Sequence, residues 1–115
     1  MTIQLTCLDF PLEKAIYLFT YAAEPGRGGD KQRFWREVMG FESPAAIRGA
    51  ILAELTVDAL SLQGQNEYGY RFQAVVSITG PSGLSWRVRT GWLVRHGETI
   101  ARFITAIPER LGRQA

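Results

Sequence analysis

The stretch from residue 71 to residue 93 constrains the fold most, because two runs of alternating side chains flank a recognisable turn. In this turn, "GPSGL", proline and serine occupy the middle and Gly83 supplies a left-handed residue, which is typical of a three-residue hairpin loop with a glycine bulge. A slip of one residue would bury arginines, so one register is strongly favoured. The predicted pairs are Ile78 with Trp86, Val76 with Val88, Ala74 with Thr90 and Phe72 with Trp92 on the apolar face, and Ser77 with Arg87 and Arg71 with Leu93 on the other.

The next turn, "HGET", predicts a further strand after residue 99. Gly97 stands at the first central position, as a two-residue type II′ loop prefers. The strand arginines then lie on the opposite face from Thr90 and Thr105, so these groups are predicted to be separate. The pairs that this turn predicts are Trp92 with Phe103, Thr90 with Thr105 and Val88 with Ile107.

Two helices are predicted before residue 41. The first covers about residues 10–22, with Asp9 as its N-cap and Pro11 in its first turn. The second lies in "DKQRFWREVMG", where Asp30 is a candidate cap and Gly40 stands at the stop position. The predicted apolar stripes are Leu12, Ile16 and Phe19, with Ala15 and Ala22 alongside, in the first helix, and Phe34, Trp35, Val38 and Met39 in the second.

A third helix is predicted to begin with Ser43 as N-cap and Pro44 at the first helical position, and its apolar stripe at spacing four is Ile47, Ile51 and Leu55. The following segment "TVDALSLQG" is predicted to form a strand built on Leu60 and Leu62, with continued helix as the alternative. Together the elements predict an α+β fold of two layers. Two to three N-terminal helices pack on one face of a three- to four-stranded antiparallel sheet.

Length and composition limit the class of protein. With 115 residues and 46% hydrophobic content, residues 1–115 are expected to form a single domain. Cys7 is the one cysteine, which excludes an internal disulfide and a multi-cysteine metal site and suits a reducing cytoplasm. No apolar run approaches the roughly 18 residues of a membrane span, and no export signal is recognised, so no membrane partner is expected. The acidic residues are scattered, and neither a metal nor a cofactor is expected.

Basic charge is concentrated in the strand-rich part of the chain. Residues 68–115 contain seven arginines against Glu98 and Glu109, whereas residues 1–67 contain six basic and nine acidic residues. Arginine binds phosphate or carboxylate through a planar fork, so this surface favours RNA or another polyanion as its partner. The alternative is a solvated face that resists edge-to-edge association. The predicted face consists of Arg71, Gln73, Ser77, Arg87, Arg89 and Arg102.

Five blocks carry a resemblance: "LEKAIYLFTYA", "GRGGDKQRFWREVMGF", "YGYRF", "VRTGW" and "RFITAIP". In this order they resemble a small uncharacterised bacterial domain that occurs alone and at the C-termini of phage-associated and polymorphic-toxin-like proteins. Its order of helices before an antiparallel sheet is similar to the fold of the barnase, EndoU, colicin-type and RelE-type ribonucleases. The connector "AAEPGRGG" departs from the pattern, because related sequences often have a histidine there. The resemblance implies metal-independent RNA cleavage, with catalytic residues at Lys31, Arg71, Arg89, Thr90 and Thr105.

Three hypotheses follow for the function. The first is an RNA-directed, toxin-like, metal-independent ribonuclease in which arginines hold the scissile phosphate and Lys31 or His96 moves protons. In this hypothesis, Arg87, Arg102 and His96 add RNA contacts. The second is a nonenzymatic interaction module, such as an antitoxin, an immunity protein or a phage-associated partner, that binds an acidic surface of a cognate protein. The third is a nucleic-acid binder without turnover.

Overall fold

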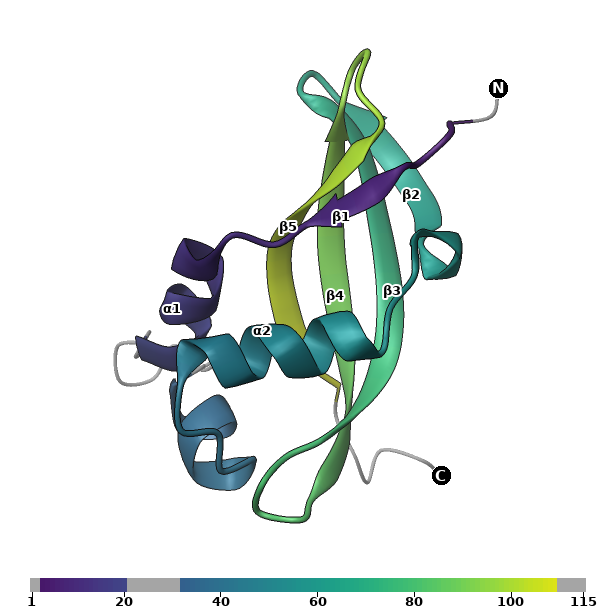
Figure 1. Ribbon diagram of the computed structural model, residues 1–115. Helices are drawn as coiled ribbons and strands as arrows, with labels where there is room; N and C mark the ends of the chain where they lie inside the picture. Colours follow the sequence, from purple (N-terminus) through teal and green to yellow (C-terminus); the bar gives the residue numbers. More distant parts are fainter. Residues whose placement is uncertain (1–2, 21–31, 110–115) are drawn as a thin grey trace.

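The computed structural model describes residues 3–20 and 32–109 (Figure 1). The strands form one five-stranded sheet in the order β1-β5-β4-β3-β2. The helix α2 crosses one face of this sheet, and α1 and η1 lie beside α2 (Figure 1). In chain order the elements are β1 (Cys7–Asp9), α1 (Leu12–Thr20), the π-helical segment η1 (Arg33–Val38), α2 (Pro44–Ala53), the 3-10 turn η2 (Val57–Ala59), β2 (Ser61–Asn66), β3 (Gly69–Thr79), β4 (Ser85–Arg95) and β5 (Ile100–Pro108).

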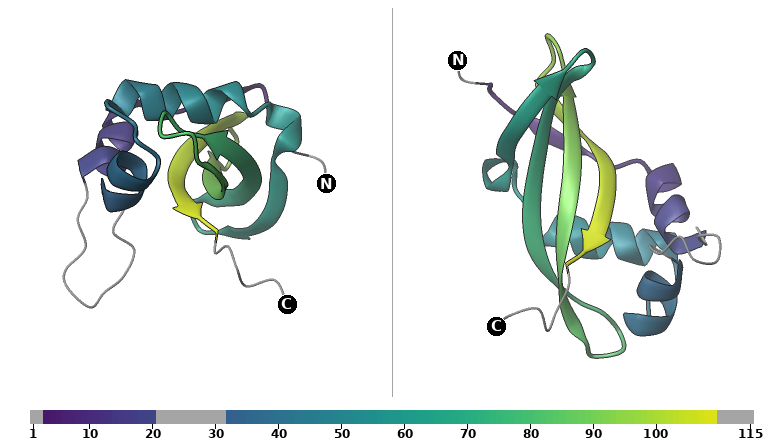
Figure 2. Two further views of the ribbon diagram at one scale, coloured as in Figure 1. Left: turned by 90° about the horizontal axis from the view of Figure 1, so that it is seen from below. Right: turned by 180° about the vertical axis from the view of Figure 1, so that it is seen from behind.

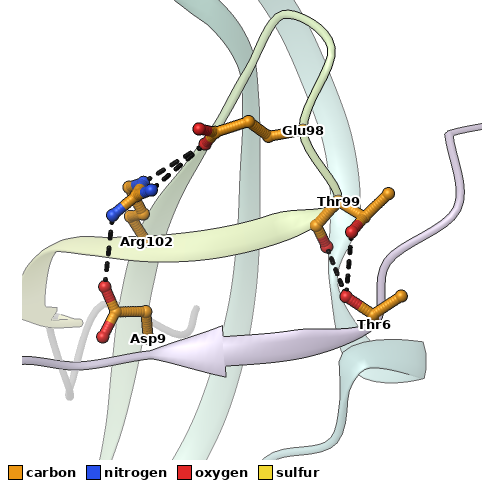
Figure 3. A network of polar contacts seen from close by, with 5 residues as sticks. All are labelled: Thr6, Asp9, Glu98, Thr99 and Arg102. Carbon is orange, nitrogen blue, oxygen red and sulfur yellow. Dashed lines mark hydrogen bonds and ion pairs between the residues drawn. The ribbon is translucent and has the colours of Figure 1, made fainter.

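The predicted α+β class is confirmed, but the sheet is larger than predicted and is mixed. The strand that was not predicted is β1. It runs parallel to β5, with Asp9 opposite Arg102. A strand of three residues is too short for its alternation to appear in the sequence. The guanidinium of Arg102 ties this edge together, because it contacts Asp9 at 3.4 Å and Glu98 at 3.2 Å (Figure 3). Beside it, the hydroxyls of Thr6 and Thr99 share a hydrogen bond of 2.9 Å.

The hairpin of β3 and β4 has the predicted register throughout. The predicted pairs are present on both faces, from Phe72 with Trp92 to Ser77 with Arg87. Gly83 has a φ of 93°, and its N–H donates to the carbonyl of Gly80 at 2.9 Å. Since the turn fixes the register, it also fixes the face on which each side chain of the two strands lies.

The register of β4 and β5 differs from the prediction beyond Trp92. The predicted pair of Trp92 with Phe103 is confirmed, but the ladder then shifts, so that Gly91 faces Thr105. Ile104 is the extra residue of a β-bulge, and one extra residue exchanges the faces of those that follow it. The predicted pairs that are wrong are Thr90 with Thr105 and Val88 with Ile107.

The turn between β4 and β5 is also different from the predicted type II′ loop. The N–H of Glu98 donates to the carbonyl of Arg95 at 3.0 Å, so the turn runs from Arg95 to Glu98. Gly97 is its third residue and has a φ of 82°. A positive φ at this position is typical of a type II turn, so glycine is favoured here, but one position later in the turn than predicted.

The predicted apolar stripe of α1 is only partly buried. Ala15, which was predicted beside the stripe, is buried, and Phe19 packs against the core, whereas Leu12 and Ile16 are 48% and 43% exposed. Leu18, which was not in the predicted stripe, is buried. Because α1 has apolar residues on more than one face, periodicity did not decide which of them points inward. The predicted N-cap, Asp9, is the last residue of β1, where its carboxylate serves the contact with Arg102.

The segment predicted as a second helix is helical but wound as a π-helix over Arg33–Val38. Gly40 follows it with a φ of 81°, as expected for the stop position. The predicted cap, Asp30, lies outside the described residues. Three of the predicted stripe residues are buried, namely Phe34, Trp35 and Met39.

The helix α2 begins as predicted. The Oγ of Ser43 accepts a hydrogen bond from the N–H of Ala46 at 3.1 Å, and Pro44 is the first helical residue. The strand predicted after it is confirmed from Ser61 onward, behind the short η2. In the described ranges, no helix combines the length and apolar character that crossing a membrane requires. The predicted core residues of this region, all buried, are Ile47, Ile51 and Leu55.

The core lies between the helices and one face of the sheet. The alternate strand residues point to the other face, which no described helix covers and which we call the helix-free face (Figure 2). The sheet is strongly curled, and seen end-on its strands β5 and β2 bend toward the side away from α2 (Figure 2). The buried strand residues are Phe72, Ala74, Val76, Ile78, Val88, Thr90, Trp92, Val94, Ala101, Phe103 and Ala106.

Candidate functional site

The helix-free face contains a hollow of about 540 Å³, which we call the trough. The strands β2, β3, β4 and β5 all contribute residues to its lining. Its volume lies in the range of small-ligand sites. The polar side chains along it belong to Gln63, Asn66, Arg71, Gln73, Arg89 and Thr105, and the apolar ones on the same face to Leu93, Ile104 and Ile107.

Gly91 lies in the middle of the trough lining. In the row that crosses the sheet, it has Gln73 of β3 on one side and Thr105 of β5 on the other. Along β4, the residues two positions away are Arg89 and Leu93, and these share its face. A residue without a side chain is therefore surrounded by an amide, a hydroxyl, a guanidinium and an apolar side chain.

Two arginines line the trough at different places along its length. Arg71 lies opposite Leu93, whereas Arg89 lies four residues before Leu93 on β4. At a rise of about 3.3 Å per residue, four residues span about 13 Å along the strand. Arg71 forms no ion pair with a described residue, while Arg89 has the carboxylate of Glu109 at 4.0 Å. The trough therefore presents two separate cationic groups to a ligand.

Glu109 is fixed beside the arginines of β4. Its N–H donates to the carbonyl of Arg87 at 2.9 Å, and its carbonyl accepts from the Nε1–H of Trp86 at 2.6 Å. Its carboxylate lies 3.5 Å from Arg87 and 4.0 Å from Arg89. Because the side chain of Arg87 is 65% exposed, its ion pair contributes little to stability. Arg87 does not line the trough, so it extends the basic surface beyond it.

Three of the predicted catalytic residues meet in the trough. Arg71, Arg89 and Thr105 all line it, although they come from three different strands. The prediction that Thr105 lies on the opposite face from the arginines is therefore wrong. The bulge at Ile104 is the physical reason, because it turns Thr105 to the helix-free face.

Thr90, by contrast, lies on the apolar face as the register predicted. It borders the trough but is fully buried. Its hydroxyl donates to the carbonyl of Ala74 at 2.8 Å and accepts from the Nε1–H of Trp92 at 2.9 Å. A buried hydroxyl that both donates and accepts a hydrogen bond inside the core satisfies the polar groups there, and it is not presented to a ligand. The geometry therefore separates Thr90 from the other predicted catalytic residues.

Two further predicted site residues, Arg102 and His96, do not line the trough. Arg102 is half-buried and in contact with Asp9 and Glu98 (Figure 3). His96 lies in the loop between β4 and β5, where its Nε2 is 3.1 Å from the carbonyl oxygen of Asn66. Since Asn66 lines the trough, His96 stands close to one part of its lining. Lys31 lies outside the described residues.

Sequence reasoning missed several residues of the trough. Gln63 and Asn66 belong to β2, whose bulge between Leu62 and Gly64 has no signal in the residue pattern. Gly91 did carry a signal, because glycine in the interior of a strand often marks a place where another group approaches closely. Among the described residues, the trough lining contains no Asp, Glu, His or Lys. No cluster of three metal-ligating side chains occurs in the same part of the chain.

Comparisons with known proteins identify the family of the chain and a solved structure with a similar fold. Residues 13–110 match the family described as "Domain of unknown function (DUF6883)". The chain belongs to this family. The comparison with curated proteins gives no match. Among solved structures, the fold is similar to a chain of the "Contact-dependent growth inhibition toxin - immunity protein complex from Klebsiella pneumoniae 342", with a TM-score of 0.65 and 19% identity over 87% of this chain and 98% of that chain.

Proposed function

We propose that the protein is an RNA-directed component of a toxin–immunity system and that the trough binds the RNA backbone. The main support for this proposal is that Arg71, Arg89 and Thr105, which belong to three different strands, all line the trough on the helix-free face. The similarity in fold to a chain of a toxin–immunity complex supports the choice of system. The arginine-rich character of the strands supports the choice of a polyanionic ligand.

The trough suits a ligand with negative charge and hydrogen-bonding groups. Arg71 has no carboxylate partner in the described part of the chain, so no such partner competes with a phosphate for it. A guanidinium binds phosphate through two parallel hydrogen bonds, which fixes orientation as well as supplying charge. The amide of Gln73 and the hydroxyl of Thr105 add neutral hydrogen-bonding groups between the two arginines.

The proposed reaction is RNA cleavage without a metal. A base accepts the proton of a ribose 2′-hydroxyl, the 2′-oxygen bonds to the adjacent phosphorus, and the bond from phosphorus to the 5′-oxygen breaks as that oxygen takes up a proton. The products are a cyclic 2′,3′-phosphate end and a 5′-hydroxyl end. Arg89 stabilises the negative charge that builds on the scissile phosphate in the transition state, and Arg71, farther along the trough, binds a neighbouring phosphate of the same strand.

Three residues are candidates for the proton transfers. Lys31 and His96 are the two predicted from the sequence. Glu109 is added by the structure, because its carboxylate contacts Arg89, which lines the trough. A carboxylate oxygen is a chemically suitable acceptor for the proton of a 2′-hydroxyl. Proton transfer by Glu109 requires the bound phosphate to lie on the Arg89 side of the trough.

The test is incubation of the purified protein with total RNA in the presence of a chelator. Cleavage by the wild type that is lost in Arg71→Ala, Arg89→Ala and Lys31→Ala supports the ribonuclease. Arg95→Ala is the matched control, because Arg95 is exposed at the end of β4 and does not line the trough. Salt-sensitive binding without cleavage identifies a binder without turnover, and the absence of both rejects RNA as the ligand.

A second candidate is a nonenzymatic module that binds an acidic surface of a cognate protein. The lining favours it, because among the described residues it offers no carboxylate, imidazole or amine for proton transfer. In this role Arg71 and Arg89 pair with carboxylates of the partner and not with phosphates. Calorimetric titration with an acidic partner protein distinguishes this module from the ribonuclease. The module is supported if Arg71→Ala weakens the complex with the partner protein and the wild type neither binds nor cleaves RNA.

A further inference from the structure

We infer that the trough seats one unpaired nucleobase on the backbone of Gly91, which makes single-stranded RNA, and not duplex RNA, its ligand. This inference rests on the proposed function and specifies the ligand class of the same trough. Its starting point is a glycine in the interior of β4, a strand of 11 residues, at the place where β3, β4 and β5 together line the hollow.

The backbone does not require glycine at position 91. Gly91 does not have a positive φ, so other residues can adopt its conformation. A Cβ atom there would lie 3.4 Å from the Cγ2 of Thr105, which is an ordinary van der Waals distance. Glycine in a strand interior is unfavourable, since it has the most conformational freedom to lose and no side chain to pack. Gly91 also lies at the register shift that the bulge of β5 produces, where glycine is common, and its lack of a side chain leaves the floor of the trough open.

The residues around Gly91 match the parts of a nucleotide. The amide of Gln73 has donors and an acceptor and Thr105 has a hydroxyl, so both can hydrogen-bond the edge of a base that lies between them. Arg89, two positions away along β4, takes an adjoining phosphate. Leu93, two positions away in the other direction, offers an apolar contact to the base.

Base pairing removes these contacts. In a duplex the Watson–Crick edges are already paired and the bases are stacked, so only a base that has left the stack reaches the floor over Gly91. The two aromatic residues that border the trough, Phe72 and Trp92, are buried in the core. Recognition therefore depends on hydrogen bonds to the base edge, and not on the aromatic stacking by which many single-strand binders work.

The first experiment compares the affinity of the intact protein for three forms of one fluorescent oligoribonucleotide: the single strand, its duplex, and the single strand with abasic sites. The wild type is expected to bind the single strand about tenfold more tightly than either other form, which corresponds to one or two hydrogen bonds to the base. Equal affinity for all three forms overturns the inference but leaves RNA binding intact. No binding to any form overturns the inference and the proposed function together.

The second experiment places the base. In Gly91→Val, valine favours a strand and fills the floor, so a folded protein is expected that binds the single strand about tenfold more weakly and the duplex unchanged. Ser77→Val is the matched control, because Ser77 is exposed on the same face outside the trough. Circular dichroism verifies folding, and Gly91→Ala takes the place of Gly91→Val if valine prevents it. A folded Gly91 variant with wild-type affinity for the single strand overturns the inference.

Discussion

Thr105 of β5 lies opposite Gly91 of β4, and not opposite Thr90. The extra residue Ile104 shifts the ladder by one position, which turns Thr105 toward the helix-free face and leaves Ala106 in the core. Two threonines on adjoining strands consequently have different roles. Thr90 satisfies polar groups of the core, and Thr105 joins the arginines in the trough.

Replacing Arg71 or Arg89 by alanine is expected to weaken RNA binding and to reduce its dependence on salt. Each arginine that contacts a phosphate releases about one counterion, so each variant lowers the slope of log K against log salt by about one. Fluorescence anisotropy titrations at several salt concentrations measure the slope. Arg95→Ala is expected to keep the wild-type slope, and an unchanged slope in the trough variants would show that their guanidinium groups do not contact phosphate.

Thr90→Val is expected to lower the free energy of unfolding by about 1–3 kcal/mol, because the indole N–H of Trp92 loses its buried acceptor and the carbonyl of Ala74 loses a donor. Thr105→Val is expected to act mainly on RNA affinity, since Thr105 lines the trough. Urea unfolding and RNA titration of both variants test this difference. The opposite pattern, with Thr90→Val reducing affinity at unchanged stability, would contradict the separation of the two roles.

Glu109→Gln is expected to strengthen the binding of RNA several-fold. The substitution removes a negative charge beside Arg87 and Arg89, so a ligand phosphate no longer competes with the carboxylate for them. If Glu109 is the proton acceptor, cleavage falls while binding strengthens. Measuring both quantities on one protein preparation separates the two effects, and weaker binding by the glutamine variant rules out the competition.

Phe10→Ala is expected to cost about 3–5 kcal/mol of stability, the usual loss for a buried phenylalanine. Phe10 is buried, its ring stacks on Phe103 with centroids 3.9 Å apart, and it meets Trp92 edge-on at 6.3 Å. Asp9→Asn is the comparison, and it is expected to change stability by less than about 1 kcal/mol because its pair with Arg102 is partly exposed. Chemical unfolding of both variants checks this order, and equal losses would contradict it.

The parts of the fold that the sequence predicted are those where two independent signals agree. In the hairpin of β3 and β4, the turn residue Gly83 and the alternation of both strands specify one register, and that register is present. At the start of α2, the cap residue Ser43 and the following Pro44 mark the same boundary, and the helix begins there. Either signal alone left more than one possibility.

The register of β5 was mispredicted because the alternatives were nearly equivalent. The segment "RFITAI" has apolar residues at both alternate sets of positions, so a shift by one residue buries Ala106 in place of Thr105 without burying a charge. The strand β1 was missed because three residues carry too little pattern. The buried face of α1 was only partly predicted, because Leu12 and Ile16 are as apolar as the buried Leu18.

Several residues that line the trough were singled out from the sequence, but the geometry that brings them together was not predicted. Arginine-rich strands indicated an anionic ligand, and Arg71, Arg89 and Thr105 do line one trough. That Thr105 shares this face depends on a bulge, and that Gln63 contributes depends on a second bulge in β2. Both bulges depend on pairing between strands, which local sequence preference does not determine.

The family match begins at residue 13, and this leaves β1 and Phe10 outside it. A fragment cut at that boundary would remove the stacking partner of Phe103 and one of the two carboxylates that hold Arg102. It would also remove the strand that pairs with residues 100–102, so that β5 would be an unpaired sheet edge along its whole length, and free backbone groups of this kind invite aggregation. Fragments for expression should therefore start before the edge strand β1, and not where sequence similarity begins.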